Sequence, residues 1–256
     1  KGELYTPFDQ PLKHSVKSAH CDSDGILWLG TQNHGIIEVD LKGRRISYHD
    51  HPSILEDVPG EVWAIQEVGN ALWLGTLGHG LRRFDPATGA VSMIDFPGFG
   101  ARNIHRIRKD PKNRIWIGSS MGMLRFDPGT GEHRHYSRDA CVRATLGSNA
   151  VWDIHVGRDE RLWVAHNRGV SHARQSPMFM AYDDLTHGVP TPVNAFLIDD
   201  RGRYWLGGDQ ELVVFDPDQA SVARTYSVEN TGAILEDLNI LAAFQTSTNE
   251  KFFGSY

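Results

Sequence analysis

A seven-residue segment with a central tryptophan recurs along the whole chain. Residues 25–31 read GILWLGT, and the later copies are NALWLGT (70–76), NRIWIGS (113–119), ERLWVAH (160–166), GRYWLGG (202–208) and a degraded EKFFGS (250–255). The anchor aromatic residues are spaced 45, 43, 47, 42 and 47 residues apart. A period of about 45 residues is typical of four-stranded propeller blades, whereas helical repeats of this length need an apolar 3.6-residue periodicity that is missing here. The sequence therefore predicts an all-β fold, a β-propeller of four-stranded blades.

Each repeat divides into four short segments with the character of β-strands. The first segments alternate apolar and polar residues and lie at 16–20, 62–66, 104–108, 151–155, 193–197 and 240–244. The second segments carry the tryptophan, the third follow a glycine-containing loop, as at 35–40 and 80–85, and the fourth lie at 45–49, 91–94, 133–136 and 223–226. Turns such as DSDG (22–25), DPATG (85–89) and DPGTG (127–131) supply the Asp, Pro and Gly that tight turns prefer.

The recurring Trp-x-Gly pattern has a packing explanation. One large ring at the same place in every blade can fill the wedge between neighbouring sheets, and such a ring buries roughly 150–250 Å². A glycine two residues later removes bulk where strands crowd together. We therefore interpret this pattern as structural.

The repeats place the blades near residues 10–50, 51–95, 96–137, 138–185, 186–227 and 228–256, the last one partial. We expect residues 1–256 to form one propeller domain or a fragment of one, with about five and a half blades. Residues 1–9 look like the outer strand of a preceding blade. The chain thus reads as part of a longer array, and whether residues 3–8 complete the sixth blade is left open.

The composition argues against nucleic-acid binding and against a membrane-spanning segment within this sequence. The chain has 26 Lys and Arg residues against 32 Asp and Glu, a net charge of −6, whereas a nucleic-acid-binding protein needs a basic face. No run of about 18 apolar residues occurs, so we expect membrane attachment only through a segment outside this sequence. The chain opens at Lys1 without an apolar leader, which fits a cleaved leader or a fragment. Cys21 and Cys141 fit neither a zinc spacing nor a disulfide framework, and whether they pair is left open.

The motifs of common catalytic and cofactor sites are missing. The 13 histidines include no H-E-x-x-H pair, and the sequence has no G-x-S-x-G nucleophile turn and no G-x-G-x-x-G loop. His133 and His135 alternate along one predicted strand and share a face, but we expect no metal there. We expect no cofactor and no catalytic residues, although a Ser-His-Asp triad assembled in space is not excluded by the sequence.

Candidate ligand contacts lie in loops at one end of the blades. The loops between second and third strands share this end with the blade-to-blade connections, and loops on a rigid scaffold commonly carry binding residues. We expect a polar ligand to contact residues of both sets: Asn33, His34, His79, His166, Arg168, Asp209, Gln210, Arg102 and Arg138. His34 and His79 occupy equivalent positions in consecutive blades. Each of these side chains can also be read as a solvated turn residue.

The repeat resembles the two-component regulator propeller repeat. The resemblance is carried by Leu-Trp-Leu-Gly-Thr, by the Asp-Pro-x-Thr-Gly turn and by the upstream Val-Trp-x-Ile at residues 62–65 and 151–154. Five good copies and one partial copy cover almost the whole chain. The fourth copy departs from the pattern at Ala165 and His166 and lacks the Phe-Asp-Pro turn, so we expect an irregular blade there.

The resemblance implies a non-catalytic sensor or interaction domain in the periplasm, outside the inner membrane. It would belong to a bacterial membrane signalling receptor with a histidine kinase or diguanylate cyclase output, and propellers of this family usually have seven blades. We expect it to detect a small polar ligand such as an oligosaccharide, or a protein partner, and to self-associate in the full-length receptor. The alternatives are a propeller scaffold for protein–protein interaction and a propeller enzyme of the lyase, lactonase or glycosidase type.

Overall fold

The structure is a computed structural model of the 256-residue chain. It describes residues 14–43, 45–49, 61–139, 145–157, 161–173, 179–182, 187–227, 240, 242–246 and 250–254. The chain divides into two compact units, unit 1 (Lys1–Ile107) and unit 2 (Arg108–Tyr256).

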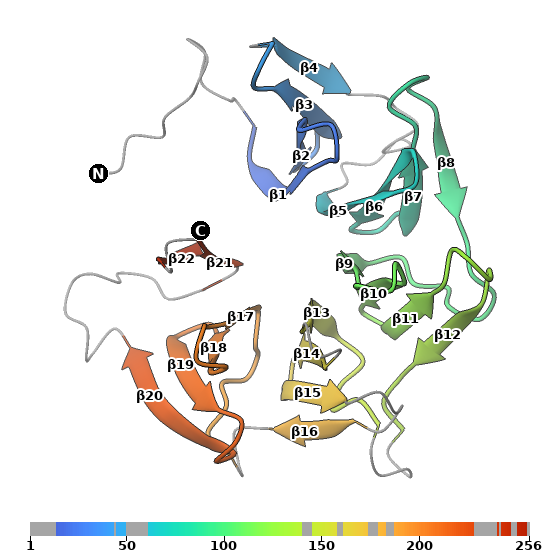
Figure 1. The fold of residues 1–256 in the computed structure, drawn as a ribbon. Coiled ribbons are helices and arrows are strands. Elements are labelled where there is room, and N and C mark those ends of the chain that lie inside the picture. The colour runs from blue at the N-terminus through green and yellow to red at the C-terminus, as the bar shows by residue number, and fades with distance from the viewer. Residues whose placement is uncertain are drawn as a thin grey trace. The chain divides into compact units, whose positions relative to one another are not determined.

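Unit 1 contains two four-stranded antiparallel sheets in which each strand pairs with the next one along the chain. The first sheet comprises β1 (Val16–Cys21), β2 (Leu27–Thr31), β3 (Ile36–Asp40) and β4 (Arg45–His49). The second comprises β5 (Val62–Val68), β6 (Ala71–Thr76), β7 (Leu81–Phe84) and β8 (Val91–Ile94). Strands β1 and β5 lie side by side, so the sheets meet along their first strands (Figure 1).

The remaining sheets repeat this order (Figure 1). The third comprises β9 (Ile104–Lys109), within which the unit boundary falls, β10 (Ile115–Ser119), β11 (Gly122–Phe126) and β12 (His133–Tyr136). The fourth comprises β13 (Val151–Val156), β14 (Leu162–His166), β15 (Gly169–Ala173) and β16 (Met180–Tyr182), and the fifth β17 (Ala195–Ile198), β18 (Tyr204–Gly207), β19 (Glu211–Asp216) and β20 (Ser221–Ser227). Strands β21 (Ala242–Gln245) and β22 (Lys251–Gly254) form a two-stranded sheet.

The predicted strands agree closely with the observed ones. Strands β4, β8 and β12 have the predicted bounds, whereas β17 begins at Ala195 and not at residue 193. The fourth sheet ends in the short β16, and residues 174–178 lie outside the described residues. Residues 1–9 lie there too, so the outer strand predicted at that place stays a prediction, as does the seven-bladed ring.

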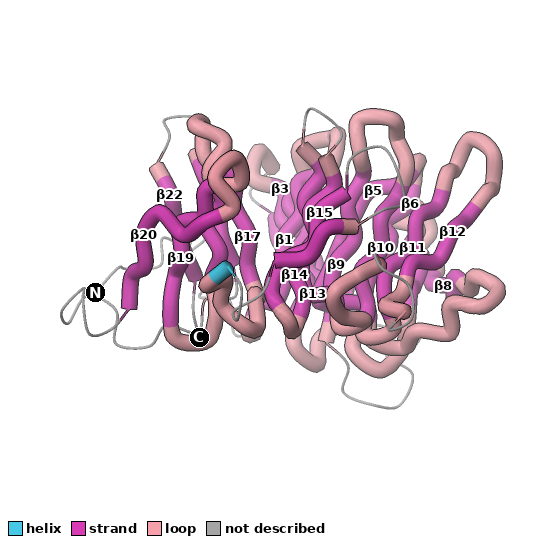
Figure 2. The backbone as a smooth tube through the Cα atoms, turned by 90° about the horizontal axis from the view of Figure 1, so that it is seen from below, coloured by secondary structure: helices cyan, strands magenta, loops and turns pink. Residues whose placement is uncertain are grey.

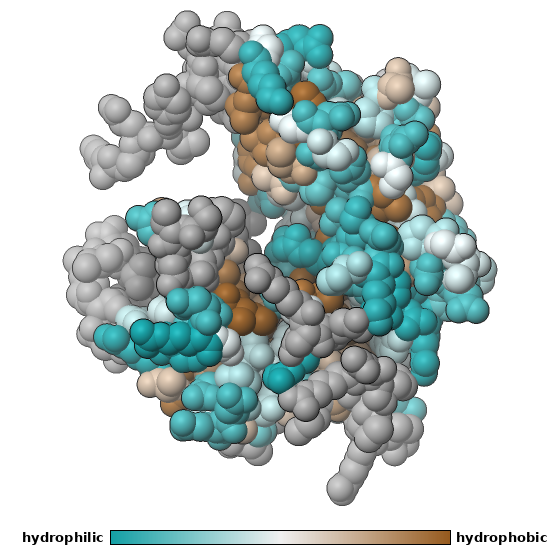
Figure 3. Space-filling model, in the orientation of Figure 1, coloured by the Kyte–Doolittle hydropathy of each residue, from teal (hydrophilic) through white to brown (hydrophobic). Residues whose placement is uncertain are grey.

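Loops join the strands at both ends of the sheets (Figure 2). The outer strand β12 is largely exposed, and the surface over this sheet is mostly hydrophilic on the face that Figure 3 shows. Within the described part of the chain, we find no helix with the length and apolar character needed to span a membrane.

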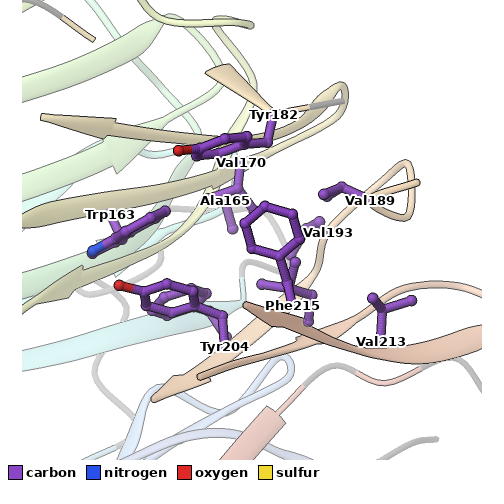
Figure 4. Close-up of a cluster of buried hydrophobic side chains, with 11 residues drawn as sticks. Trp163, Ala165, Val170, Tyr182, Val189, Val193, Tyr204, Val213 and Phe215 are labelled. Carbon is purple, nitrogen blue, oxygen red and sulfur yellow. The ribbon is translucent and has the colours of Figure 1, made fainter. Parts of the chain in front are cut away.

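The repeated tryptophans pack between neighbouring sheets, as predicted. Trp28 shares a buried cluster with Val62 and Ile65 of the following sheet, and Trp116 packs in the same way with Val151 and Ile154. In the fourth sheet, the Trp163 ring lies 4.1 Å from that of Tyr204 and 6.0 Å from that of Phe196, measured between ring centroids (Figure 4). These rings form the hydrophobic cores between blades.

In four blades the glycine two residues after the tryptophan faces the beginning of the next blade. A Cβ atom at Gly75 would lie 2.8 Å from Ile104 Cγ2 and 3.0 Å from the Ile104 carbonyl oxygen. A Cβ atom at Gly118 would lie 2.7 Å from Val151 Cγ1, and one at Gly207 would lie 2.5 Å from Ile240 Cγ2. The glycine therefore sets how closely two sheets approach.

Replacing Gly75 by alanine is expected to lower the free energy of unfolding by about 1–3 kcal/mol, because the added methyl overpacks a tight interface. Urea unfolding followed by tryptophan fluorescence measures this. The control is Gly129→Ala, in an exposed turn, where an effect within about 0.5 kcal/mol is expected. Equal effects at the two positions would contradict the packing role of Gly75.

In three blades a turn aspartate accepts a hydrogen bond from the tryptophan indole. The Nε1 atoms of Trp28, Trp116 and Trp205 donate to Asp22, Asp110 and Asp199 over 2.7, 2.9 and 3.1 Å. The second carboxylate oxygen of each aspartate accepts the backbone N–H groups two and four residues further along. The aspartate therefore closes the turn and fixes the ring together.

In the third and fifth blades an arginine completes this arrangement. Arg114 Nε donates to Asp110 over 2.7 Å, and Arg203 Nε donates to Asp199 over 3.0 Å. Burial alone would raise the pKa of both carboxyl groups, but the hydrogen bonds from the indole, the backbone and the arginine outweigh it and lower the pKa. Both aspartates are therefore held as carboxylates.

Candidate functional site

Three first strands begin with a β-bulge. In β5, Val62 pairs with Thr76 and Ala64 with Gly75, so Trp63 is the extra residue. Lys17 in β1 and Trp152 in β13 hold the same position. A bulge redirects the extra side chain and is frequent next to binding sites. All three bulges lie at the end of their sheet that carries the loops between second and third strands.

In unit 1, Glu61 fixes the groups around the Trp63 bulge. Trp63 Nε1 donates to Glu61 Oε2 over 2.5 Å, and Gln32 Nε2 donates to Glu61 Oε1 over 2.6 Å. Lys17 Nζ lies 3.9 Å from Glu61 Oε2, and both of these side chains are largely shielded from water. The His105 ring packs 5.8 Å from the Trp63 ring. The result is an aromatic ring beside a carboxylate, an amide and an ammonium group, all held in place.

The predicted residues of unit 1 lie in the neighbouring loops. Asn33 is exposed with a φ of 70°, and the ring centroid of the half-buried His34 lies 3.9 Å from that of His14, with the two rings tilted by 39°. His79 lies half-buried in the equivalent turn of the next sheet, where the Gly80 N–H donates to the carbonyl of Arg102 over 2.7 Å. The structure thus brings the His79 turn and the exposed Arg102 together through their backbones.

In unit 2 the same positions form two further hydrogen-bonded pairs. Trp152 Nε1 donates to Asn167 Oδ1 in the turn between β14 and β15. Asn194, immediately before β17, donates from Nδ2 to Asp209 Oδ1 over 2.7 Å. Trp152 in β13 and Asn194 just before β17 thus each donate to an acceptor in the loop between the second and third strands, which brings the predicted Asp209 into the site.

The other predicted loop residues of unit 2 are exposed. Arg168 and Gln210 lie in the loops between second and third strands. Arg138 follows β12, and its N–H donates to Asn149 Oδ1 over 2.6 Å. Their side chains are accessible to a ligand, and their role in binding stays a prediction.

His166 lies inside the blade and not in the loop to which the sequence analysis assigned it. It is the last residue of β14 and is fully buried, in the place that Thr31, Thr76 and Ser119 hold in other blades. Its Nε2 lies 2.8 Å from Ser171 Oγ, and its Nδ1 accepts the Arg168 N–H over 3.1 Å. Burial, with a smaller contribution from the charge of Arg168, lowers the pKa of His166 to about 4. The ring is therefore neutral at pH 7 and supports the turn that presents Arg168.

Among the described residues, no three His, Cys, Asp or Glu side chains gather as metal ligands would. His133 and His135 lie on the exposed outer strand β12, and His135 Nε2 lies 2.9 Å from the carbonyl oxygen of Met121. Cys21 is exposed at the end of β1, and Cys141 lies outside the described residues.

Five residues of this site were not predicted from the sequence: Lys17, Glu61, Trp63, Trp152 and Asn194. The usable signal was the Val-Trp-x-Ile segment, which occurs at the start of two first strands and was used only as a mark of resemblance. In a regular strand, alternation alone decides on which face a side chain lies. Trp63 and Trp152 are the extra residues of their bulges, so they do not follow that alternation.

The successive four-stranded sheets, joined along their first strands within each unit, define a β-propeller, and the predicted fold class is confirmed. Neither a protein-family model nor a curated protein sequence matches the chain. Comparison with solved structures, in contrast, yields many matching chains.

One similar structure is the extracellular domain of a protein assigned to the hybrid two-component systems of B. thetaiotaomicron. It is 18% identical with a TM-score of 0.54, and the match covers 94% of this chain and 37% of that one. PorZ, a surface component of the type-IX secretion system of Porphyromonas gingivalis, is 18% identical with a TM-score of 0.64, covering 91% and 36%. Virginiamycin B lyase from Staphylococcus aureus, solved with quinupristin, is 13% identical with a TM-score of 0.69, covering 94% and 77%.

Receptor ectodomains of the kind that the repeat resembles are thus among the proteins that share this fold. The chain spans about a third of the length of these B. thetaiotaomicron domains. At such low identities the likeness concerns the fold.

Proposed function

We propose that this chain is a non-catalytic sensor or interaction region of a bacterial membrane signalling receptor and works in the periplasm. The repeat resemblance and the receptor ectodomains of the same fold support the proposal. The observation that carries it is the repeated bulge, which in both units places an aromatic or polar side chain against a fixed hydrogen-bonding group. Signalling then requires that the ligand bind two receptor conformations with different affinities.

The side chains at the bulges favour a polar ligand with apolar faces, such as an oligosaccharide. An indole ring offers a flat apolar surface, and the groups around it offer hydrogen bonds of fixed direction. Trp63 with Glu61 and Gln32, and Trp152 with Asn167, both have this combination. Self-association of the whole receptor, and a purely protein-binding role for the blades, remain alternatives for the same surface.

Replacing Trp63 by alanine is expected to weaken oligosaccharide binding at least about tenfold, because a well-packed tryptophan in a binding site commonly contributes more than 1.4 kcal/mol. Calorimetric titration with maltohexaose, cellohexaose and chitohexaose first identifies which of them binds. The control Met93→Ala, at an exposed residue of β8, should leave the affinity unchanged.

Two results would contradict the proposal. Binding that is equally strong in the Trp63→Ala and Met93→Ala variants would remove Trp63 from the site. Conversion of quinupristin by the chain would instead support an enzyme, the alternative that the likeness to virginiamycin B lyase favours.

A further inference from the structure

In the third blade, two arginines stand opposite each other on the two outer strands. Arg125 of β11 pairs directly with Arg134 of β12, and on its other side Arg125 pairs with Trp116 of β10. Residues directly opposite in an antiparallel pair share a face of the sheet, with Cβ atoms about 4.5–5.5 Å apart, and like charges at such positions are destabilising. The two arginines therefore repel each other unless a negative charge lies beside both.

The other blades do not repeat this pair. The positions that pair in the same way with each repeated tryptophan hold one arginine or none: Glu38 and Ser47, Arg83 and Ser92, His172 and Met180, Val214 and Arg224. Arg83 in the second blade also has an acidic partner, since its Nη2 lies 3.6 Å from Asp85 Oδ2. The packing of the repeat thus does not require two arginines at these positions.

Within the described residues, no acidic side chain neutralises the pair. Neither Arg125 nor Arg134 forms an ion pair or a side-chain hydrogen bond there. The carboxylate of Asp127 is engaged by two backbone N–H groups of its own turn. Residues 108–138 carry seven Lys and Arg against three Asp and Glu, in a chain whose net charge is −6. The third blade is thus a cationic part of an acidic chain.

Both guanidinium groups can be reached from solvent, and one rests on a fixed surface. Arg134 is exposed, and its guanidinium carbon lies 5.3 Å from the centroid of the Tyr136 ring. The Tyr136 ring packs against those of Trp116 and Phe179, which holds it in place beneath the arginine. Arg125 is half-buried, and among its nitrogen atoms only Nε is buried without an acceptor, so its terminal nitrogens keep contact with solvent.

We propose that Arg125 and Arg134 together bind the sulfate or phosphate group of a small ester. Such a group has three terminal oxygens and can accept hydrogen bonds from two guanidinium groups at once, whereas the two oxygens of a carboxylate suit one guanidinium. Its charge also removes the repulsion between the arginines. Strand β12 is the outermost of its sheet, so this anion site is separate from the bulges of the first strands and does not depend on the proposed function.

The first test follows Arg125 by NMR while glucose 6-sulfate or glucose 6-phosphate is added at constant ionic strength. The buried Nε–H of Arg125 is the reporter, because shielding from water slows its exchange, and the Arg125→Val variant identifies its resonance. We expect a saturable shift with one or both esters and none with glucose. The ester that binds more tightly identifies the source of the group.

Matched variants on the outer strands locate the site. Arg134→Ala should raise the dissociation constant at least about tenfold, because the charge-assisted hydrogen bonds of one guanidinium are lost. The control is Arg224→Ala in the fifth blade, which should leave the affinity unchanged. Arg224 also lies over a tyrosine, with its guanidinium carbon 4.6 Å from the Tyr226 ring centroid, but it stands opposite Val214.

Three results would overturn the proposal. An unchanged Arg125 resonance in both ester titrations of the wild-type chain would do so whether or not the variants fold. Equal affinities in Arg134→Ala and Arg224→Ala would remove Arg134 from the site. A saturable shift with glucuronate in the absence of any shift with the two esters would show that the pair selects a carboxylate.

Discussion

Replacing Asp110 by alanine is expected to lower the free energy of unfolding by about 3–5 kcal/mol, because removing one partner of a buried ion pair leaves uncompensated groups. Asp110 is 3% exposed and accepts hydrogen bonds from the Trp116 indole, the Arg114 guanidinium and two backbone N–H groups. The variant leaves all these donors without an acceptor and also loosens the turn. Urea unfolding followed by tryptophan fluorescence measures the change.

The control for Asp110 is Asp24→Ala, an exposed residue of the equivalent turn in the first blade, with an expected effect within about 0.5 kcal/mol. The lowered pKa of Asp110 adds a pH test. Its contribution to stability is present above the ordinary aspartate pKa and is lost as the pH falls through the lower folded-state pKa. If the Asp110→Ala variant lost no more stability than Asp24→Ala, the carboxylate would not be what holds the blade.

Acidification from pH 7 to pH 4 is expected to remove up to about 3 kcal/mol of stability through His166. Its pKa is lowered from 6.5 to about 4 in the folded chain, so on acidification the unfolded chain takes up the proton first. Folding therefore becomes less favourable as the pH falls through this interval. Protonation of Nδ1 would also break the bond that it accepts from the Arg168 N–H.

The His166→Thr variant isolates this effect, since threonine is the residue of the equivalent positions 31 and 76. Because the substitution also changes stability at pH values where His166 does not titrate, the quantity to compare is the slope of unfolding free energy against pH between 4 and 6.5. We expect the slope to decrease in His166→Thr and to stay unchanged in His133→Gln, on the exposed strand β12. Equal slopes in all three proteins would show that His166 titrates normally.

The fold was largely predictable from the sequence because its strongest signals are repeated. A tryptophan every 45 residues or so and the glycine after it report one packing interface that occurs again and again, and these residues do pack as predicted. The bond from Trp116 to Asp110 was missed, although its six-residue spacing recurs in the sequence. The need to satisfy a buried indole N–H could have revealed it.

The candidate site was less predictable because it depends on single residues that break the repeat. Counting residues in an alternating strand cannot show which residue is the extra one of a bulge, so Trp63 and Trp152 were missed. His166 was assigned to a loop because histidine is polar, yet its alignment with Thr31 and Thr76 pointed to a strand end. The partners of Glu61 come from three separate strands or turns, which no local pattern connects.

The contact between Gly75 and Ile104 has a consequence for how such a chain can evolve. One blade contributes the glycine of its second strand and the next contributes an apolar residue of its first strand, so the interface is heterologous and joins blades head to tail. Duplicating or deleting one whole repeat would recreate the same interface on both sides of the change. Blade number can therefore vary between descendants by unequal recombination of their genes, while the chemistry of each interface is inherited intact.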